Sequence, residues 1–417
     1  MLKPASQAMP RRIASVAAAA ALLAGVAVTA ATASSKKPAH GSSSHLLVGL
    51  NDEANTLYPP NILTAFQTLR SLKTQVLRVN LYWGGTKWAV ANKKPADPTD
   101  PGDPAYNWSL YDRLAKYAHD YNITLMLTIL FTPSWANGGK ARTVAPTNPK
   151  ELQDFAYAAA VRYSGYYVPP SWQQNSSLGI GNSALPFVGR WTAWNEPNNP
   201  IWLSPQYKRV GGKWVIESAV QYAKICNAVY TGIHAVLISP QQGQVPDEQV
   251  ACGVTGPKGN DAPGTARASV DPMSFLVVAH NAGMRDFDAY AHHPYYSASK
   301  ESPTYVPTGN FKRRIQLGNI NTLISEVTKL YGPHPLWITE YGYQTNPPDK
   351  TFGVSWATQA AWLKKAYAIA RANPSITIML WFLIKDEPNL GGWQSGLETA
   401  AGKQKPAWNA FLSIPRG

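Results

Sequence analysis

Short runs rich in Val, Ile, Leu and aromatic residues recur along the chain and alternate with longer segments whose apolar residues follow helical spacing. Eight of these runs predict strands, and they begin at His45, Val76, Thr124, Arg190, Ala235, Phe287, Pro335 and Ile376. The segments between them, such as 111–121 and 218–234, predict amphipathic helices. Eight apolar strands joined by helical crossovers predict an α/β fold, a single (β/α)8 (TIM) barrel with long βα loops.

Polar residues at the C-terminal ends of the strands are the functional candidates in such a barrel, because active sites form there. Four long segments follow strand ends and are expected to form the walls of a cleft: 132–150, 197–216, 241–270 and 294–317. An open, doubly wound sheet is the alternative fold. No glycine-rich phosphate-binding loop follows the first predicted strand, which argues against that alternative.

The N-terminal 33 residues have the order of a secretory signal peptide: cations, the apolar run 13–30, then small residues up to Ala33. An uncleaved membrane anchor is the alternative, since about 20 apolar residues are enough to span a bilayer. The polar stretch 34–44 predicts a flexible spacer, and 45–417 is expected to form the barrel. We therefore expect a secreted or envelope-associated protein with no stable membrane insertion after cleavage.

Composition narrows the choice of partner. The 417 residues are 45% hydrophobic and 15% charged, and the 15 Trp and 21 Tyr exceed what a core needs, so some rings are expected to face a ligand. The net charge of +14 becomes +11 without the three cations of the leader. Lys and Arg are scattered, with the densest cluster at 312–314, so no nucleic-acid partner is predicted. A monomer is expected.

Two cysteines, Cys226 and Cys252, permit one intramolecular disulfide, and export favours it. The alternative is a pair of buried thiols that act as small apolar residues. A catalytic cysteine is least favoured, because no His stands in a recognisable relation to either thiol.

Two glutamates terminate apolar runs: Glu196 ends the fourth predicted strand and Glu340 ends the seventh. Ionised carboxylates are costly to bury, so their place calls for a reason beyond a solvated or salt-bridged loop residue, which is the alternative for each. Two carboxyl groups that face each other across a barrel mouth are typical of glycosidic bond cleavage, with one protonated and one ionised. Like charges in one cleft also push their pKa values apart.

The motifs WNEPN at 194–198 and WITEYGY at 337–343 resemble clan A of the glycoside hydrolases, most of all its families 39 and 5. The resemblance covers the chain from His45 to about Ile414. It implies that Glu196 is the acid/base, that Glu340 is the nucleophile, and that Asn195 donates to the sugar 2-hydroxyl.

Other strand-end residues fit the same resemblance. Arg78 interrupts an apolar strand and is untenable there without a partner, unless it reaches past the helices to solvent. The resemblance implies that it hydrogen-bonds Glu340. His293 and Tyr295 lie two residues apart, hence on one face, and the resemblance places them in the site, whereas His292 should point away. A core His and a packing Tyr are the alternative.

Aromatic residues are the expected sugar platforms. The resemblance implies that Trp381 floors the sugar subsite, with a core residue as the alternative, and Trp135 is a second substrate-binding candidate. Further candidates are Trp83, Trp202 and Trp393. Two acids after strands one and eight, Asp52 and Asp386, are favoured as solvated loop residues over hydroxyl-binding ones.

Asn195 and Glu196 would point to opposite faces of a regular strand, so a bulge or twist is predicted at that strand end. The predicted function is a retaining glycoside hydrolase that cleaves β-linked oligo- or polysaccharide through two glutamates. No cofactor or metal is expected, since the His residues lack ligand spacing. A non-catalytic carbohydrate-binding barrel and a transglycosylase are the alternatives.

Overall fold

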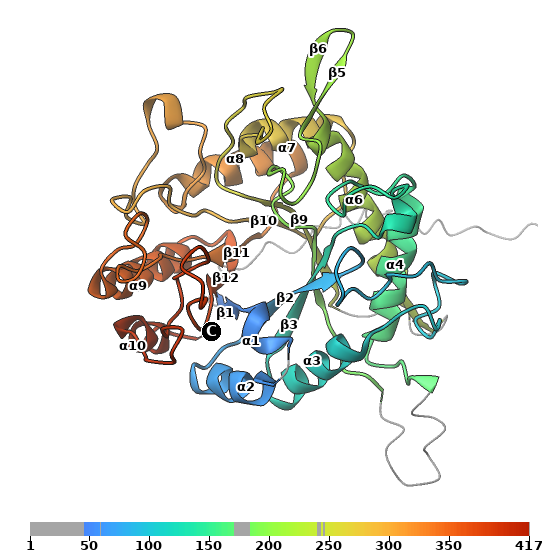
Figure 1. The fold of residues 1–417 in the computed structure, drawn as a ribbon, viewed down its shortest axis with the longest axis horizontal. Helices are drawn as coiled ribbons and strands as arrows, with labels where there is room; N and C mark the ends of the chain where they lie inside the picture. The colour runs from blue at the N-terminus through green and yellow to red at the C-terminus, as the bar shows by residue number, and fades with distance from the viewer. Residues whose placement is uncertain (1–45, 59, 171–183, 240–242, 245–246, 417) are drawn as a thin grey trace, which may run out of the picture. The chain divides into compact units, whose positions relative to one another are not determined.

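Eight parallel strands close into a barrel in the computed structural model, which describes residues 46–58, 60–170, 184–239, 243–244 and 247–416 (Figure 1). In barrel order the strands are β1 (Leu47–Asn51), β2 (Val76–Tyr82), β3 (Thr124–Leu130), β4 (Arg190–Ala193), β9 (Gln249–Thr255), β10 (Ala289–His292), β11 (Leu336–Tyr341) and β12 (Ile376–Phe382). The predicted (β/α)8 fold is confirmed.

Helices surround the strands, and those other than α10 coincide with the predicted amphipathic segments (Figure 1). They are α2 (Ile62–Ser71), α3 (Ser109–Asp120), α4 (Pro149–Arg162), α6 (Glu217–His234), α7 (Pro272–Asn281), α8 (Ile320–Tyr331), α9 (Trp356–Ala372) and α10 (Pro406–Leu412). Shorter elements lie in the loops: α1 (Glu53–Thr56), β5 (Tyr207–Val210), β6 (Lys213–Ile216), β7 (Leu237–Ser239), β8 (Gly243–Gln244), η1 (Ser134–Ala136), η3 (Gly309–Phe311) and η4 (Leu317–Asn319).

Side-chain caps fix where several of these helices begin. The Asp271 carboxylate accepts hydrogen bonds from the backbone N–H groups of Met273 and Ser274 at the start of α7, and Ser355 accepts one from Thr358 at the start of α9. Such caps pair backbone donors that the first turn leaves unsatisfied.

The predicted signal peptide at 1–33 and spacer at 34–44 lie outside the described residues. Among the helices that the structure does describe, none combines the length and the apolar character required to span a bilayer.

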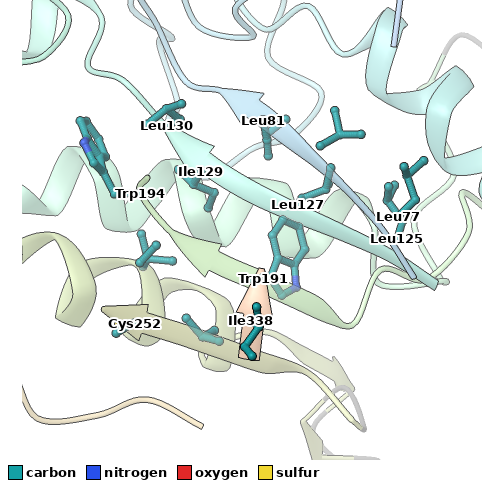
Figure 2. Close-up of a cluster of buried hydrophobic side chains, with 14 of the residues drawn as sticks. Leu77, Leu81, Leu125, Leu127, Ile129, Leu130, Trp191, Trp194, Cys252 and Ile338 are labelled. Carbon is teal, nitrogen blue, oxygen red and sulfur yellow. The ribbon is translucent and has the colours of Figure 1, made fainter. Parts of the chain in front are cut away.

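The core has two layers, and alternation along the strands separates them. In β2, Val76 belongs to the cluster inside the barrel, whereas Leu77 and Leu81 pack outward against the helices. Figure 2 shows these leucines beside Leu125 and Leu127 of β3. Near the mouth of the barrel the inward positions become polar and buried: Arg78, Thr128, Thr192 and Thr339. The candidate chemistry therefore lies where the apolar filling of the barrel ends.

The fifth strand is not the one predicted. The run from Ala235 supplies only β7, which pairs with β8 in a small antiparallel sheet outside the barrel, and Leu237 is 58% exposed. The barrel position between β4 and β10 is taken by β9, which was assigned to a loop. At Gly253 of β9 the backbone has a φ of 88°, and an added Cβ would lie 2.4 Å from the Tyr290 ring, so this position of the strand requires glycine.

A disulfide joins Cys226 of α6 to Cys252 of β9, with their Cα atoms 5.8 Å apart. This confirms the favoured interpretation of the two cysteines. Both residues are fully buried in the layer between the barrel and the helices. The covalent link fixes β9, which is built mostly of small residues, to the helix that precedes it in the barrel.

Removing the disulfide should destabilise the fold. Because the link closes a segment with a sequence separation of 26 residues, we expect the Cys226→Ala, Cys252→Ala double variant to lose about 2–4 kcal/mol of unfolding free energy. Urea denaturation followed by tryptophan fluorescence measures it. Reductant should lower the stability of the native protein and leave the double variant unchanged. An equal midpoint for the native protein with and without reductant would contradict the prediction.

Candidate active site

The backbone is distorted where β4 delivers Glu196. The strand ends at Ala193, and Trp194 and Glu196 adopt positive φ values of 70° and 34°. Non-glycine residues rarely occupy this region, so the surroundings must hold them there. One such support is the hydrogen bond from the Glu196 N–H to the Val254 carbonyl of β9. The predicted distortion is present, and it directs both Asn195 and Glu196 to the barrel mouth.

A second irregularity, which the sequence did not reveal, delivers Glu340. In the pairing of β11 with β12, Ile338 is opposite Met379 and Tyr341 is opposite Trp381, so β11 holds one extra residue. Ile338 and Tyr341 both pack in the outer layer. The two residues between them, Thr339 and Glu340, therefore both turn inward, whereas regular alternation would send Glu340 toward the helices.

The two glutamates share one gap. His293 Nδ1 lies 3.1 Å from Glu196 Oε1 and 3.7 Å from Glu340 Oε2. One oxygen of each carboxylate lies within 4.8 Å of the other. Carboxyl groups this close are typical of retaining enzymes, whose carboxyl groups are about 5–5.5 Å apart, rather than of inverting enzymes, in which they are roughly 6.5–9.5 Å apart. The imidazole is fully buried and its Nε2 is 2.9 Å from the Thr339 hydroxyl.

Arg78 connects four strands through one planar group. Its Nη1 donates to Glu340 Oε1 at 2.6 Å, which is the contact expected from the sequence. Its Nη2 donates to Asn195 Oδ1 at 2.7 Å and its Nε donates to Thr128 Oγ1 at 2.8 Å. The residue is 1% exposed, so these partners replace water around the buried charge. Because Oδ1 of Asn195 is held, its amide nitrogen is the atom left to donate to a ligand.

The pKa of Glu340 lies below its ordinary value of 4.5. Burial acts to raise it, but the charges of His293 and Arg78, with hydrogen bonds from Arg78 and Tyr295, outweigh burial. The Tyr295 hydroxyl donates to Glu340 Oε2 at 3.1 Å, and Asn51 Nδ2 donates to Oε1 at 3.3 Å. Asn51 was not predicted. As the last residue of β1, it could have been found by its position at a strand end.

His292 and His293 separate as predicted. His292 points away from the gap, with Nδ1 2.8 Å from the Thr255 hydroxyl and Nε2 3.0 Å from the Ile315 carbonyl. Burial lowers the pKa of His292 to about 3, so it is neutral over the working range of most proteins. Its neighbour His293 is the histidine that faces the glutamates.

Trp381 does not line the site, contrary to the prediction. Ile378 and Leu380 of the same strand face into the barrel, so Trp381 faces the helices, where it is 0% exposed. Its indole N–H donates to the Ser395 carbonyl at 2.9 Å. Phe382 occupies the next inward position, with its ring 5.3 Å from that of Trp393. The aromatic floor is therefore displaced by one residue.

Trp135 also proves structural. Its indole N–H donates to the Ala91 carbonyl at 2.8 Å, and its ring meets Trp83 edge to face at 5.7 Å. Trp83 is fully buried, and Trp202 stacks on Phe131. These partners come from neighbouring loops and hold the rings in place.

Asp52 and Asp386 are neither solvated nor placed to bind substrate. Asp52 is fully buried and accepts hydrogen bonds from Asn55 N–H and from Ile384 N–H across the barrel seam. Asp386 forms a buried ion pair with Lys405 at 2.7 Å. Ile384 and Lys405 are distant in sequence from the acids that they contact, which is why position alone suggested loop acids.

A cavity of about 820 Å³ opens beside Glu196, within the size range of ligand pockets, roughly 300–1,000 Å³. Of the tryptophans considered as platforms, Trp393, 36% exposed, lines it. Other lining residues are Tyr295, Tyr296, Phe352, Ile201, Lys258 and Arg267. An aromatic wall and a cationic wall thus flank the carboxylate.

Glu196, His293 and Glu340 also offer three possible metal ligands within 4.8 Å of one another. Glu340 already has its charge balanced by Arg78, which weakens the attraction for a cation. The expectation that the chemistry needs no metal stays a prediction.

The sequence matches no protein-family model and no curated protein. Solved structures of similar fold are glycoside hydrolases. One is a family 39 enzyme from the gut symbiont Bacteroides cellulosilyticus WH2, with 18% identity, a TM-score of 0.56, and coverage of 89% of this chain and 63% of that chain. Another is a glucosidase from Croceicoccus marinus, with 14% identity, a TM-score of 0.58, and coverage of 89% and 67%.

An exo-β-1,4-mannosidase from Opitutaceae bacterium strain TAV5 is similar at 13% identity and a TM-score of 0.53, over 88% of this chain and 59% of that chain. The chain thus spans about two thirds or less of these proteins. At these identities the similarity establishes the fold, and it confirms the expected (β/α)8 barrel.

The charge balance of Glu340 gives a testable pH dependence. Replacing Arg78 by Met removes a cation and its hydrogen bond, both of which lower the pKa of Glu340. Burial, which raises this pKa, is then less opposed, so the pKa of Glu340 should rise. In the native protein the folded-state pKa is the lower one, so the pair stabilises the fold above pH 4.5 and this stabilisation is lost as the pH falls through that pKa. Titration of 13C-labelled Glu carboxyl groups by NMR measures both pKa values.

Arg162→Met is the matched control. Arg162 is also a buried guanidinium, paired with Asp112 at 2.6 Å, but it has no contact with the glutamate pair. It should leave the pKa of Glu340 in place. An unchanged pKa in Arg78→Met would contradict the assigned electrostatics.

Proposed function

We propose that this protein is a retaining glycoside hydrolase that acts on a β-linked oligo- or polysaccharide. The observation that carries the proposal is the shared gap between Glu196 and Glu340, with His293 in contact with both carboxylates. A binding protein gains nothing from two carboxylates held at this spacing, whereas glycosidic bond cleavage requires them. The fold shared with glycoside hydrolases supports the same conclusion.

The reaction proceeds in two displacements. Glu340, kept ionised by its lowered pKa, attacks the anomeric carbon while Glu196 transfers its proton to the departing glycosidic oxygen. The products of this step are a glycosyl ester on Glu340 and a free alcohol. Glu196, now ionised, removes a proton from water, and the resulting hydroxide displaces Glu340 from the same face that the alcohol left. Configuration is retained.

The surrounding residues have distinct roles in this scheme. Arg78 and Tyr295 hold the two oxygens of Glu340 and keep the carboxylate aimed across the gap. Asn195, anchored by Arg78, presents its amide nitrogen toward the sugar 2-hydroxyl, where a hydrogen bond strengthens in the transition state. His293 and Thr339 fix the two acids relative to each other.

Export and an extended substrate belong to the same proposal. The signal peptide predicted at 1–33 supports secretion, where polymeric carbohydrate is met. A large open cavity beside Glu196 supports an oligosaccharide over a single sugar. Similar folds include an exo-β-1,4-mannosidase and a glucosidase, and the β-linkage is inferred by analogy with the mannosidase.

Replacing Glu340 and replacing Glu196 should lower the turnover in different ways. Glu340→Gln removes the nucleophile, and we expect turnover of an activated aryl β-glycoside to fall by roughly 10⁴-fold or more. Glu196→Ala removes the acid/base and should cost about 10²–10⁴-fold. Sodium azide should restore turnover in Glu196→Ala alone, because azide attacks the glycosyl ester without a base. Release of the aryl group from a panel of glycosides provides the rates, and NMR of the azide product provides its configuration.

Glu217→Gln is the control, since Glu217 is a buried, ion-paired glutamate on α6 that lies outside the pair. It should retain activity. Azide rescue of Glu340→Gln, or an inverted azide adduct from Glu196→Ala, would overturn the assignment. Binding without cleavage across the whole panel would favour a non-catalytic carbohydrate-binding barrel, and transfer to added sugars in place of water would identify a transglycosylase.

A further inference from the structure

The cavity beside Glu196 has a cationic wall that the reaction does not use. Lys258 and Arg267 line it, and both belong to the segment that follows β9. Glu196 is the single acidic residue among those that line it, all of which the structure describes. When Glu196 carries the proton that it donates, the cavity is left with two cations and no anion.

These cations lack partners of their own. Among the described residues, no carboxylate lies within ion-pair distance of Lys258 or Arg267, whereas the nearby Arg313 pairs with Asp271 at 3.3 Å. The pKa of Lys258 is lowered, because partial burial and the charge of Arg314 outweigh the attraction of Glu301 and Glu196. An ammonium in this situation gains from an added anion. Both side chains are solvent-exposed and can be reached by a ligand.

Positive charge continues from this wall onto the neighbouring hairpin of β5 and β6. Lys208 of this hairpin is paired with Glu217 at 2.6 Å. The other exposed cations of the hairpin are Arg209, which stacks on Trp214 at 4.9 Å, and Lys213. The hairpin is tied to the cationic segment by the hydrogen bond from the Tyr207 hydroxyl to Asp261. In Figure 1 the two strands form an arm at the edge of the barrel near α6. The basic surface therefore extends beyond one sugar.

Aromatic side chains form another part of the cavity lining. Tyr296, Phe352 and Trp393 come from the segments after β10, β11 and β12 and line the same cavity. Aromatic faces stack on the apolar side of a pyranose or on an aryl ring. A ligand that satisfies both walls is a ring that bears an anionic group.

We propose that the cavity on the leaving-group side of Glu196 binds a ring that carries a carboxylate, with Lys258 and Arg267 as the groups that recognise the anion. The term leaving-group side rests on the proposed function, in which Glu196 protonates the departing oxygen. The carboxylate can come from a uronate sugar of an acidic glycan or from an aromatic acid. Charge-assisted hydrogen bonds from the two cations give the preference its strength.

Direct binding to the full chain tests this proposal without any need for turnover. Methyl β-D-glucuronoside is compared with methyl β-D-glucoside, and 4-hydroxybenzoate with 4-hydroxybenzamide, by ligand-observed NMR titration. We expect Kd to be about tenfold lower or more for at least one acid than for its neutral counterpart. The preference should shrink in 0.5 M NaCl, because exposed charges are screened. The pair that shows it identifies the source of the carboxylate.

The variants assign the preference to named residues. The Lys258→Gln, Arg267→Gln double variant should abolish it, Lys258→Arg should keep it, and Lys364→Gln should leave it unchanged. Lys364 is an exposed residue of α9, so that control removes one charge of the protein without touching the cavity.

Equal affinity for acid and neutral probes would overturn the inference, as would a preference that survives in the double variant. Neither outcome depends on catalysis. If binding shows the preference but no glycoside is cleaved, the proposed function fails and the anion site stands.

Discussion

The buried guanidinium of Arg78 is the constraint on which the site depends. A cation inside a barrel is unfavourable by itself, and here three side chains from three other strands, Glu340, Asn195 and Thr128, compensate it. The same contacts align the strands at the mouth of the barrel and hold Glu340 ionised. The contacts of Arg78 thus support both the packing at the barrel mouth and the ionised state of Glu340, so a change that affects one also affects the other.

The residues at the barrel mouth fall into two groups according to where they lie. Groups that we propose act on the bond sit on strands or at strand ends, where backbone hydrogen bonds and packing hold them. Groups that we propose select the ligand sit on the segments beyond, such as Lys258 after β9 and Trp393 after β12. Loop residues tolerate change better than strand residues, so ligand preference in this scaffold can vary while the glutamate pair stays in place.

Sequence patterns predicted the fold and the glutamate pair, because apolar runs end visibly at Glu196 and Glu340 and because a buried Arg78 demands a partner. The sequence patterns failed where the pairing register between strands decides which residues face the barrel interior. The run at 235–241 is apolar enough for a strand, but β7 pairs with β8 outside the barrel and β9 pairs with β4 and β10. Trp381 was chosen for its residue type, whereas alternation along β12 sends it to the helices. Which residues of two strands pair is decided by the assembled sheet, and it cannot be read from the sequence of either strand alone.

β11 has one residue more than the matching stretch of β12, and this extra residue decides which of its side chains face the site. Between Ile338 and Tyr341 the chain advances three residues while β12 advances two. Deleting one of the two intervening residues would restore even pairing and would leave a single inward position where a hydroxyl and a carboxylate now stand together. A sequence alignment that places a gap within this strand would keep the strand apolar but would lose Glu340.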